Sequence, residues 1–167
     1  DTWGAMKTNS LTLGKQWDVF YDVSSATGLS FIYAGTASGV YTFNGDGGLN
    51  GAGRANKAIQ YRNSFGNFSF GLQVQARSSS DEFFNNDPVP MAIGMNGRWS
   101  ILESISYDNT FGLSATYQFT DKFSLSAAHN QGKFKGRITG NEMIEAKDTI
   151  SAVGFKYNEL HEDGFYV

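Results

Sequence analysis

Alternation of apolar and polar residues constrains the fold of this chain more than any other feature. In the segment from Phe68 to Arg77, every second residue is apolar and the residues between them are Ser, Gly, Gln and Arg. The segment from Phe111 to Thr120 repeats this pattern. A period of two puts successive side chains on opposite faces of a β-strand, whereas an amphipathic helix has a period of about 3.6 residues. The chain is therefore predicted to be all-β, with strands that have one apolar and one polar face.

The links between the predicted strands also follow a pattern. The alternation recurs, less strictly, at 11–13, 59–61, 123–131 and 149–157. Short links cover 8–10, 63–67, 120–122 and 158–163, and long links cover 17–53, 78–110 and 132–148. Because successive antiparallel strands reverse direction, the short turns fall at one end of the sheet and the long loops at the other, as in an outer-membrane β-barrel. A soluble sandwich is the alternative, but such long loops are uncommon in compact domains.

Composition excludes several classes of function. The chain has 167 residues, the size of one domain (1–167), and only 17% are charged, against roughly 25% in soluble domains. The net charge of -3 and the lack of any Lys/Arg run argue against a nucleic-acid partner. There is no Cys for a disulfide or a Cys-ligated zinc site. The only histidines, His129 and His161, lie in no nucleophile motif, so neither an enzyme nor a cofactor is predicted.

One uncharged stretch, from Val23 to Gly45, is long enough to span a bilayer as a helix. Ser, Thr and Gly fill about half of it, which favours a Gly-rich loop. Its lack of charge predicts a loop that folds back onto the polar face of the sheet, with a short helix near 17–25. The following segment, Asn44 to Gly48, lacks the alternating carboxylates of a calcium loop and is predicted to be a turn.

Four segments carry a resemblance to a known family. Residues 11–22 (LTLGKQWDVFYD) resemble the strand that enters the inward-folded third loop of Gram-negative general porins, and residues 51–64 resemble the strand that leaves it. Residues 68–75 and 148–157 are similar to later strands of the same barrel. The resemblance implies an antiparallel transmembrane β-barrel of 16 strands in the bacterial outer membrane. This chain would be a central fragment, a partial barrel domain of about six to seven strands with the constriction loop at about 17–53.

The resemblance also implies a function and partners. General porins are homotrimers in which each subunit encloses a water-filled channel, through which small hydrophilic solutes and ions diffuse passively. Membrane lipid and lipopolysaccharide would surround the trimer. Two alternatives stay open. An oligosaccharide-selective porin would use aromatic residues such as Trp17, Phe20, Tyr21, Phe31 and Tyr33 as a slide for sugar rings, and a small structural or adhesive barrel would need about eight strands.

Candidate pore-lining residues follow from the faces of the predicted strands. By simple alternation, Arg54, Gln60 and Arg62 share a face opposite Ile59 and Tyr61 and should point into the lumen. By resemblance, Arg54 holds the position of a basic residue of the constriction. Arg77, Gln73 and Gln75 share a parity, so Arg77 is predicted to extend the basic wall. The bland alternative for Arg54 and Arg62 is an ion pair or a contact with lipopolysaccharide.

Acidic partners for these arginines are few. No acid lies between Val23 and Gly45, so the candidates are Asp18, Asp22 and Asp46. A basic wall facing a neutral loop tip predicts a weak transverse field and a preference for anions. Lys15 differs, because it has the parity of Leu11 and Leu13 and so points outward. By resemblance its strand lies at the subunit interface, and we expect Lys15 to make a trimer contact.

Overall fold

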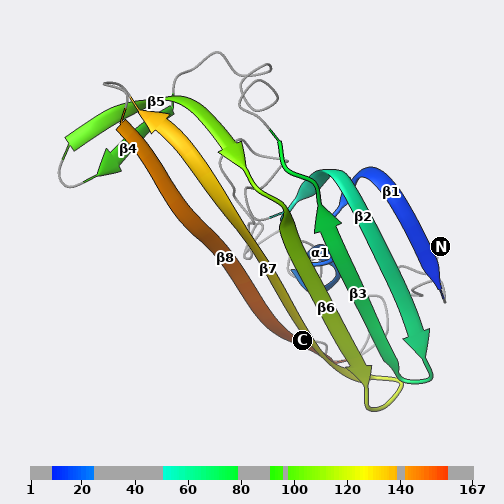
Figure 1. Ribbon diagram of the computed structural model, residues 1–167. Helices are drawn as coiled ribbons and strands as arrows, with labels where there is room; N and C mark the ends of the chain where they lie inside the picture. The colour runs from blue at the N-terminus through cyan, green and yellow to red at the C-terminus, as the bar shows by residue number, and fades with distance from the viewer. Residues whose placement is uncertain (1–8, 25–50, 79–90, 96–97, 139–141, 158–167) are drawn as a thin grey trace.

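The computed structural model describes residues 9–24, 51–78, 91–95, 98–138 and 142–157, with side chains at 9–24, 51–78, 105–137 and 143–157. These residues form eight strands and one short helix (Figure 1). In chain order they are β1 (Ser10–Trp17), α1 (Tyr21–Ser24), β2 (Arg54–Phe65), β3 (Phe68–Gln75), β4 (Met91–Met95), β5 (Arg98–Tyr107), β6 (Thr110–Gln118), β7 (Phe123–Ile138) and β8 (Glu142–Tyr157).

All eight strands belong to one antiparallel sheet. Its order is β1-β2-β3-β6-β7-β5-β4, and β8 pairs with the other edge of β7. The long strand β7 pairs with β6 along its first half and with β5 along its second half, while β8 accompanies it along its whole length. The described part of the sheet is open, so the prediction of an all-β antiparallel barrel segment is confirmed without a closed barrel.

For two of the three long links, the prediction of a loop is wrong. The link 132–148 consists mostly of the far halves of β7 and β8, which pair continuously from Phe123 with Tyr157 to Ile138 with Glu142. The link 78–110 contains β4 and β5. The reason lies in the pattern of residues. Beyond Gln131 the outward positions of β7 carry charges, and in β5 the apolar residues Ile105 and Tyr107 are the buried ones, so neither segment repeats the apolar face used to find the strands.

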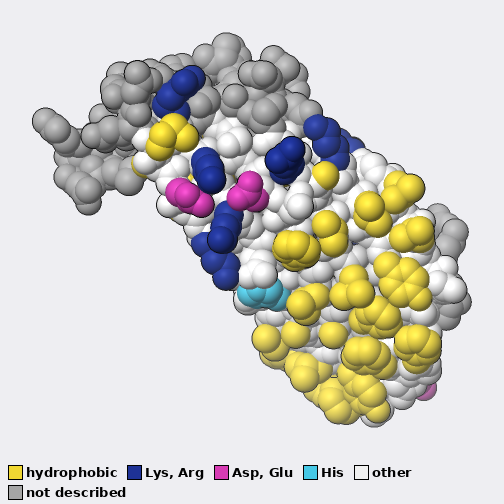
Figure 2. Space-filling view, viewed as in Figure 1, with side chains coloured by type: hydrophobic (Ala, Val, Ile, Leu, Met, Phe, Trp, Pro, Cys, Tyr) yellow, Lys and Arg dark blue, Asp and Glu magenta, His cyan; other side chains and the backbone are white. Residues whose placement is uncertain are grey.

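The two faces of the sheet differ in polarity, as the alternation predicts. On β3, Leu72 is 50% exposed whereas the adjacent Gln73 is 2% exposed. We call the face of Leu72 the outer face and the face of Gln73 the inner face. A broad apolar surface covers the outer face (Figure 2). Its exposed members include Leu11, Leu13, Ile59, Leu72, Val74, Phe111, Leu113, Tyr117, Leu125, Val153 and Phe155.

The inner face carries α1, which lies behind the sheet in Figure 1 and confirms the short helix predicted near 17–25. Phe20 and Val23 are buried there against Ala128, Ile150 and Ala152 of β7 and β8. This small cluster is an apolar core on the inner face. It holds the segment that follows β1 against the sheet.

Two glycines in the strands make room for that segment. A Cβ atom added to Gly71 of β3 or to Gly112 of β6 would lie 3.0 Å from a methyl group of Val19. Such a distance is too short for an ordinary carbon contact. Glycine inside a strand often marks a close approach of another part of the chain, and here it allows Val19 to sit directly on the inner face.

Candidate functional site

The segment that leaves β1 and returns to β2 is fastened to the inner face at both ends. Gln60 donates through Nε2 to the carbonyl oxygen of Trp17 at 2.8 Å and to Gln73 Oε1 at 2.6 Å. Gln73 Nε2 donates to the carbonyl oxygen of Gly51 at 2.7 Å. Both glutamines are buried, so these hydrogen bonds satisfy amides that water does not reach. The pair connects the start and the end of the inserted segment to β2 and β3.

The ion pair between Arg62 and Asp22 is a second contact that holds this segment on the inner face. Arg62 Nε lies 2.9 Å from Asp22 Oδ2, and Nη2 donates to Oδ1 at 3.1 Å, which makes the pair bidentate. Ser114 Oγ of β6 also donates to Asp22 Oδ2, at 3.2 Å. The side chains of Arg62 and Asp22 are 18% and 17% exposed. The guanidinium is therefore paired with the inserted segment, as the ion-pair alternative anticipated for Arg62.

Asp18 lies deeper than Asp22. Its Oδ1 accepts the backbone N–H of Tyr21 at 3.1 Å, and its Oδ2 accepts Nδ2 of Asn130 from β7 at 3.1 Å. Burial raises the pKa of Asp18 to about 7, and the negative charge of Asp22 adds to that rise, while backbone N–H donors oppose it. Asp18 therefore changes charge near neutral pH. Asn130 Oδ1 is buried and has no hydrogen-bond partner among the described groups.

A third set of hydrogen bonds lies on the inner face, where β3 ends and β6 begins. Thr110 Oγ1 donates to Gln75 Oε1 at 3.0 Å, and Gln75 Nε2 donates to the Tyr107 hydroxyl oxygen at 3.1 Å. Gly51 packs against this set with a φ of +82°, and a Cβ atom there would collide with Thr110 Oγ1. Glycine is therefore required at position 51 by both conformation and space.

A β-bulge in β2 breaks the alternation on which the face of Arg54 was predicted. Gly14 of β1 pairs with Ala58, and Gln16 pairs with Ala55, so two steps along β1 match three steps along β2. Lys57 has a φ of +51°, in the left-handed region. Because Gly14 and Gln16 share a face, Ala58 and Ala55 share it too. Every residue before the bulge therefore lies on the face opposite to the predicted one.

The predicted shared face of Arg54, Gln60 and Arg62 is therefore wrong for Arg54. Arg54 pairs with Trp17 in the register, and its guanidinium carbon lies 5.9 Å from the centre of the Trp17 indole ring. Gln60 and Arg62 do lie together, since Arg62 Nη1 donates to Gln60 Oε1. The structure thus brings Gln60, Arg62, Asp18 and Asp22 into one cluster and leaves Arg54 outside it.

The remaining predicted residues lie elsewhere. Arg77 follows the end of β3 with an exposed side chain, and its backbone N–H donates to Asn109 Oδ1 at 2.9 Å. Lys15 is exposed on β1. Asp46 lies outside the described residues, as do Phe31 and Tyr33. No group of three or more His, Cys, Asp or Glu side chains that suits a metal ion occurs in the described part of the chain.

Sequence reasoning missed Ser114 and Asn130, which complete the contacts of Asp22 and Asp18. Many inward positions of these strands carry polar residues, so the residue types of Ser114 and Asn130 alone did not single them out. The available signal was Gly71 and Gly112 inside regular strands, because glycine there indicates that another segment approaches closely.

The comparison with protein families agrees with this geometry. Residues 5–165 match the family of Gram-negative porins. The chain belongs to the Gram-negative porin family. Membership places this porin in the bacterial outer membrane, and it accounts for a sheet whose apolar side chains are exposed on one face. A search of curated proteins found no match to this porin. Among the helices of its described residues, none has the length and apolar character that crossing a membrane requires.

Proposed function

We propose that this porin contributes the wall and the constriction of a water-filled channel through which small hydrophilic solutes and ions diffuse passively. One observation carries the proposal. The segment after β1 is held on the polar inner face by the Arg62–Asp22 pair and by Gln60, while the opposite face exposes apolar side chains. A segment on the polar side of a membrane-spanning sheet lies in the aqueous path and narrows it.

The proposed channel has weak ion selectivity. The anion preference expected from the sequence required both Arg54 and Arg62 to act on the lumen. Arg62 is paired with Asp22, and Arg54 lies on the other face, so neither supports that preference. Arg77 keeps an exposed side chain and is the remaining described arginine proposed to act on passing ions.

We also propose that the protein assembles as a homotrimer and that Lys15 contributes to the contact between subunits. Lys15 alternates with Leu11 and Leu13, which are exposed on the outer face. A lysine that faced lipid at the bilayer midplane would cost about 2 to 4 kcal/mol. A neighbouring subunit with a polar group opposite Lys15 removes that cost.

An oligosaccharide-selective channel is the second candidate, and one aromatic pair bears on it. Trp17 stacks on Tyr21 with ring centres 4.7 Å apart, and Trp17 is 48% exposed. Phe20, by contrast, is buried in the core beneath α1, so it packs the segment against the sheet and is not accessible to sugars. Trp17 pairs in the register with Arg54, on the face opposite to Gln60, so the described residues offer one stacking platform that does not lie on the polar inner face, where a slide would need several.

Conductance of the complete protein in planar lipid bilayers tests the proposal. We expect stepwise openings whose current rises linearly with voltage, and little change when a chitooligosaccharide is added. Concentration-dependent block by the sugar, lost in Tyr21→Ala of α1 but not in Phe65→Ala, would establish the sugar-selective alternative. Phe65 is an exposed aromatic residue at the opposite end of β2 and serves as the control. Absence of any conductance from correctly folded protein would refute both forms of the proposal.

A further inference from the structure

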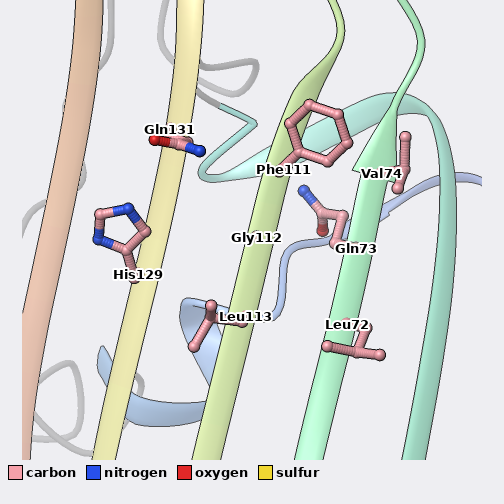
Figure 3. A pocket seen from close by; sticks show the side chains of 8 residues that line it. All are labelled: Leu72, Gln73, Val74, Phe111, Gly112, Leu113, His129 and Gln131. Atoms are coloured by element: carbon pink, nitrogen blue, oxygen red, sulfur yellow. The ribbon is translucent and has the colours of Figure 1, made fainter.

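The side-chain amides of Gln60 and Gln73, here called the amide pair, can each take two orientations that exchange a donor for an acceptor. In the structure Gln60 donates to the carbonyl oxygen of Trp17 and to Gln73, and Gln73 donates to the carbonyl oxygen of Gly51. Figure 3 shows Gln73 on β3 between two side chains of the outer face. The two glutamines are 1% and 2% exposed, so water does not compensate for a wrong orientation of either amide.

The contact with Arg62 selects one of these orientations. A guanidinium carries only N–H donors, so a group that binds it must be an acceptor. Arg62 Nη1 donates to Gln60 Oε1, which leaves Gln60 Nε2 for the contacts with Trp17 and Gln73. Nε2 has two hydrogens, and these two contacts use both of them. Gln73 must then present its Oε1 to Gln60, and its Nε2 remains to donate to Gly51.

The opposite orientation of Gln60 is unfavourable in two places. Its NH2 group would face the guanidinium of Arg62, so that donor meets donor. Its Oε1 would face the carbonyl oxygen of Trp17, which would then lose the hydrogen bond that it accepts from Gln60. Leaving a buried polar group without a partner costs more free energy than a typical hydrogen bond contributes. The amide pair therefore has one favoured direction as long as an arginine donates to it.

Arg62 is itself held in place by the start of the inserted segment. Its Nε and Nη2 bind the Asp22 carboxylate, and Nη2 also donates to the carbonyl oxygen of Asp18 at 3.3 Å. The guanidinium cannot turn away from Gln60 without breaking these contacts. Hydrogen bonds therefore run without interruption from Asp22, near the start of the segment, to Gly51, near its end. Side chains of β2 and β3 connect the two ends.

We propose that Arg62 is a positioning residue whose N–H donors orient the amide pair and thereby fix Gly51 at the far end of the inserted segment. Its effect on Gly51 passes through Gln60 and Gln73 and requires no ion in the channel. The inference rests on the proposed function for the role of the segment as the constriction. It assigns Arg62 a task that depends on the direction of hydrogen bonds, whereas an arginine that attracts anions acts through its charge alone.

Hydrogen exchange of the complete protein in detergent micelles, measured by mass spectrometry, tests this role. The quantity measured is the exchange rate of the backbone amides at 51–54, next to the carbonyl group to which Gln73 donates. Arg62→Met removes the donors and leaves the amide pair without a fixed direction, so we expect these amides to exchange about tenfold faster. Arg62→Lys keeps a donor toward Gln60 and is expected to restore most of the protection.

A double-mutant cycle separates this role from a purely structural one. Gln73→Met removes the contact with Gly51 directly, so Arg62→Met is expected to add little to the exchange rate at 51–54 once Gln73 is replaced. Gln75→Met is the matched control, because Gln75 is a buried glutamine on the same face of β3 whose hydrogen bonds go to other partners. Its effect is expected to add to that of Arg62→Met. If Arg62→Met does not fold, Arg62→Gln replaces it, since an amide can present a donor or an acceptor and fixes no direction.

Additive effects of Arg62→Met and Gln73→Met overturn the proposal, as does full protection at 51–54 in Arg62→Met. Conductance of the wild type is measured on the same preparation. Coupled exchange in a protein that does not conduct supports the positioning role and refutes the channel. Normal conductance with additive exchange refutes the positioning role and leaves the channel proposal intact.

Discussion

Adjacent residues of β3 meet opposite surroundings. Leu72 is exposed on the outer face, whereas Gln73 is buried on the inner face and forms hydrogen bonds with Gln60 and Gly51. In a soluble sheet the apolar member of such a pair would be the buried one. The comparison shows that this sheet has lipid as its outer solvent and an inserted segment of its own chain on its polar side. The stability of the outer face then depends on the membrane, and that of the inner face on hydrogen bonds and ion pairs.

The largest effect is expected from a charge placed on the outer face. Leu113→Lys puts an ammonium group among the apolar side chains of β6 and is expected to destabilise the protein by about 2 to 4 kcal/mol at the bilayer midplane. Thr116→Lys, which lies on the inner parity of the same strand, is the control. Urea unfolding of the complete protein in lipid vesicles measures both free energies. Equal losses for the two variants would contradict the assignment of the faces.

A smaller loss is expected from breaking the ion pair of the inner face. Arg62→Ala leaves the Asp22 carboxylate without its guanidinium, and we expect a loss of about 1 to 3 kcal/mol, because the pair is partly shielded from water. Reversal potentials in a KCl gradient should also move toward cation preference, since Asp22 then acts uncompensated. Arg62→Ala/Asp22→Ala is expected to recover much of the selectivity of the wild type. Arg77→Ala is the stability control, because its side chain is exposed.

A local effect of pH is expected at Asp18. Its pKa is raised in the folded state, so the folded protein holds a proton there that the unfolded chain has released between about pH 4 and pH 7. Stability contributed by this group therefore falls as pH rises through that window, and stays constant above it. Hydrogen exchange at Tyr21 and Val23 should speed up relative to Asp18→Asn as pH rises from 5 to 8. Parallel pH profiles for the two proteins would show that Asp18 does not titrate in this range.

The smallest effect is expected at Arg54. Its guanidinium lies over Trp17 on the face opposite to Gln60, and such a cation–π contact is worth about 0.5 to 1 kcal/mol at an exposed site. Arg54→Ala should lower the free energy of unfolding by no more than that. The reversal potential should remain that of the wild type. A shift as large as that of Arg62→Ala would return Arg54 to the channel wall.

The strands that alternate strictly were predictable, and the exceptions have physical causes. β3 and β6 have lipid on one side and polar contacts on the other, so apolar and polar residues alternate along their sequences. The far halves of β7 and β8 extend past the apolar surface, where Lys133 and Lys147 occupy the outward positions that an apolar pattern requires. In β5 the apolar Ile105 and Tyr107 face inward. A search for an apolar outer face misses both regions.

The site was predictable in its residue types but not in its pairing. Four residues of the cluster were identified from the sequence. Asp18 and Asp22 stood out because acidic residues are scarce in this region, and Gln60 and Arg62 because they share a face of the predicted strand. The bond between Arg62 and Asp22 joins residues forty positions apart and depends on how the inserted segment folds back. The bulge that reverses Arg54 has its positive φ at Lys57, a residue type that gives no sign of it. The local pattern therefore identified residues of the cluster, and tertiary contacts determined which of them pair.

The length of the β7–β8 hairpin has a consequence for how this porin meets its environment. Each strand has 16 residues, whereas a tilted strand crosses the hydrocarbon layer with about 9 to 11. Roughly a third of the hairpin therefore stands clear of the membrane as hydrogen-bonded sheet. Paired residues added or removed near the tip would change how far the hairpin extends beyond the membrane. The membrane-spanning part of both strands would stay the same. The exposed rim of the barrel can thus vary in size during evolution at little cost to insertion in the membrane.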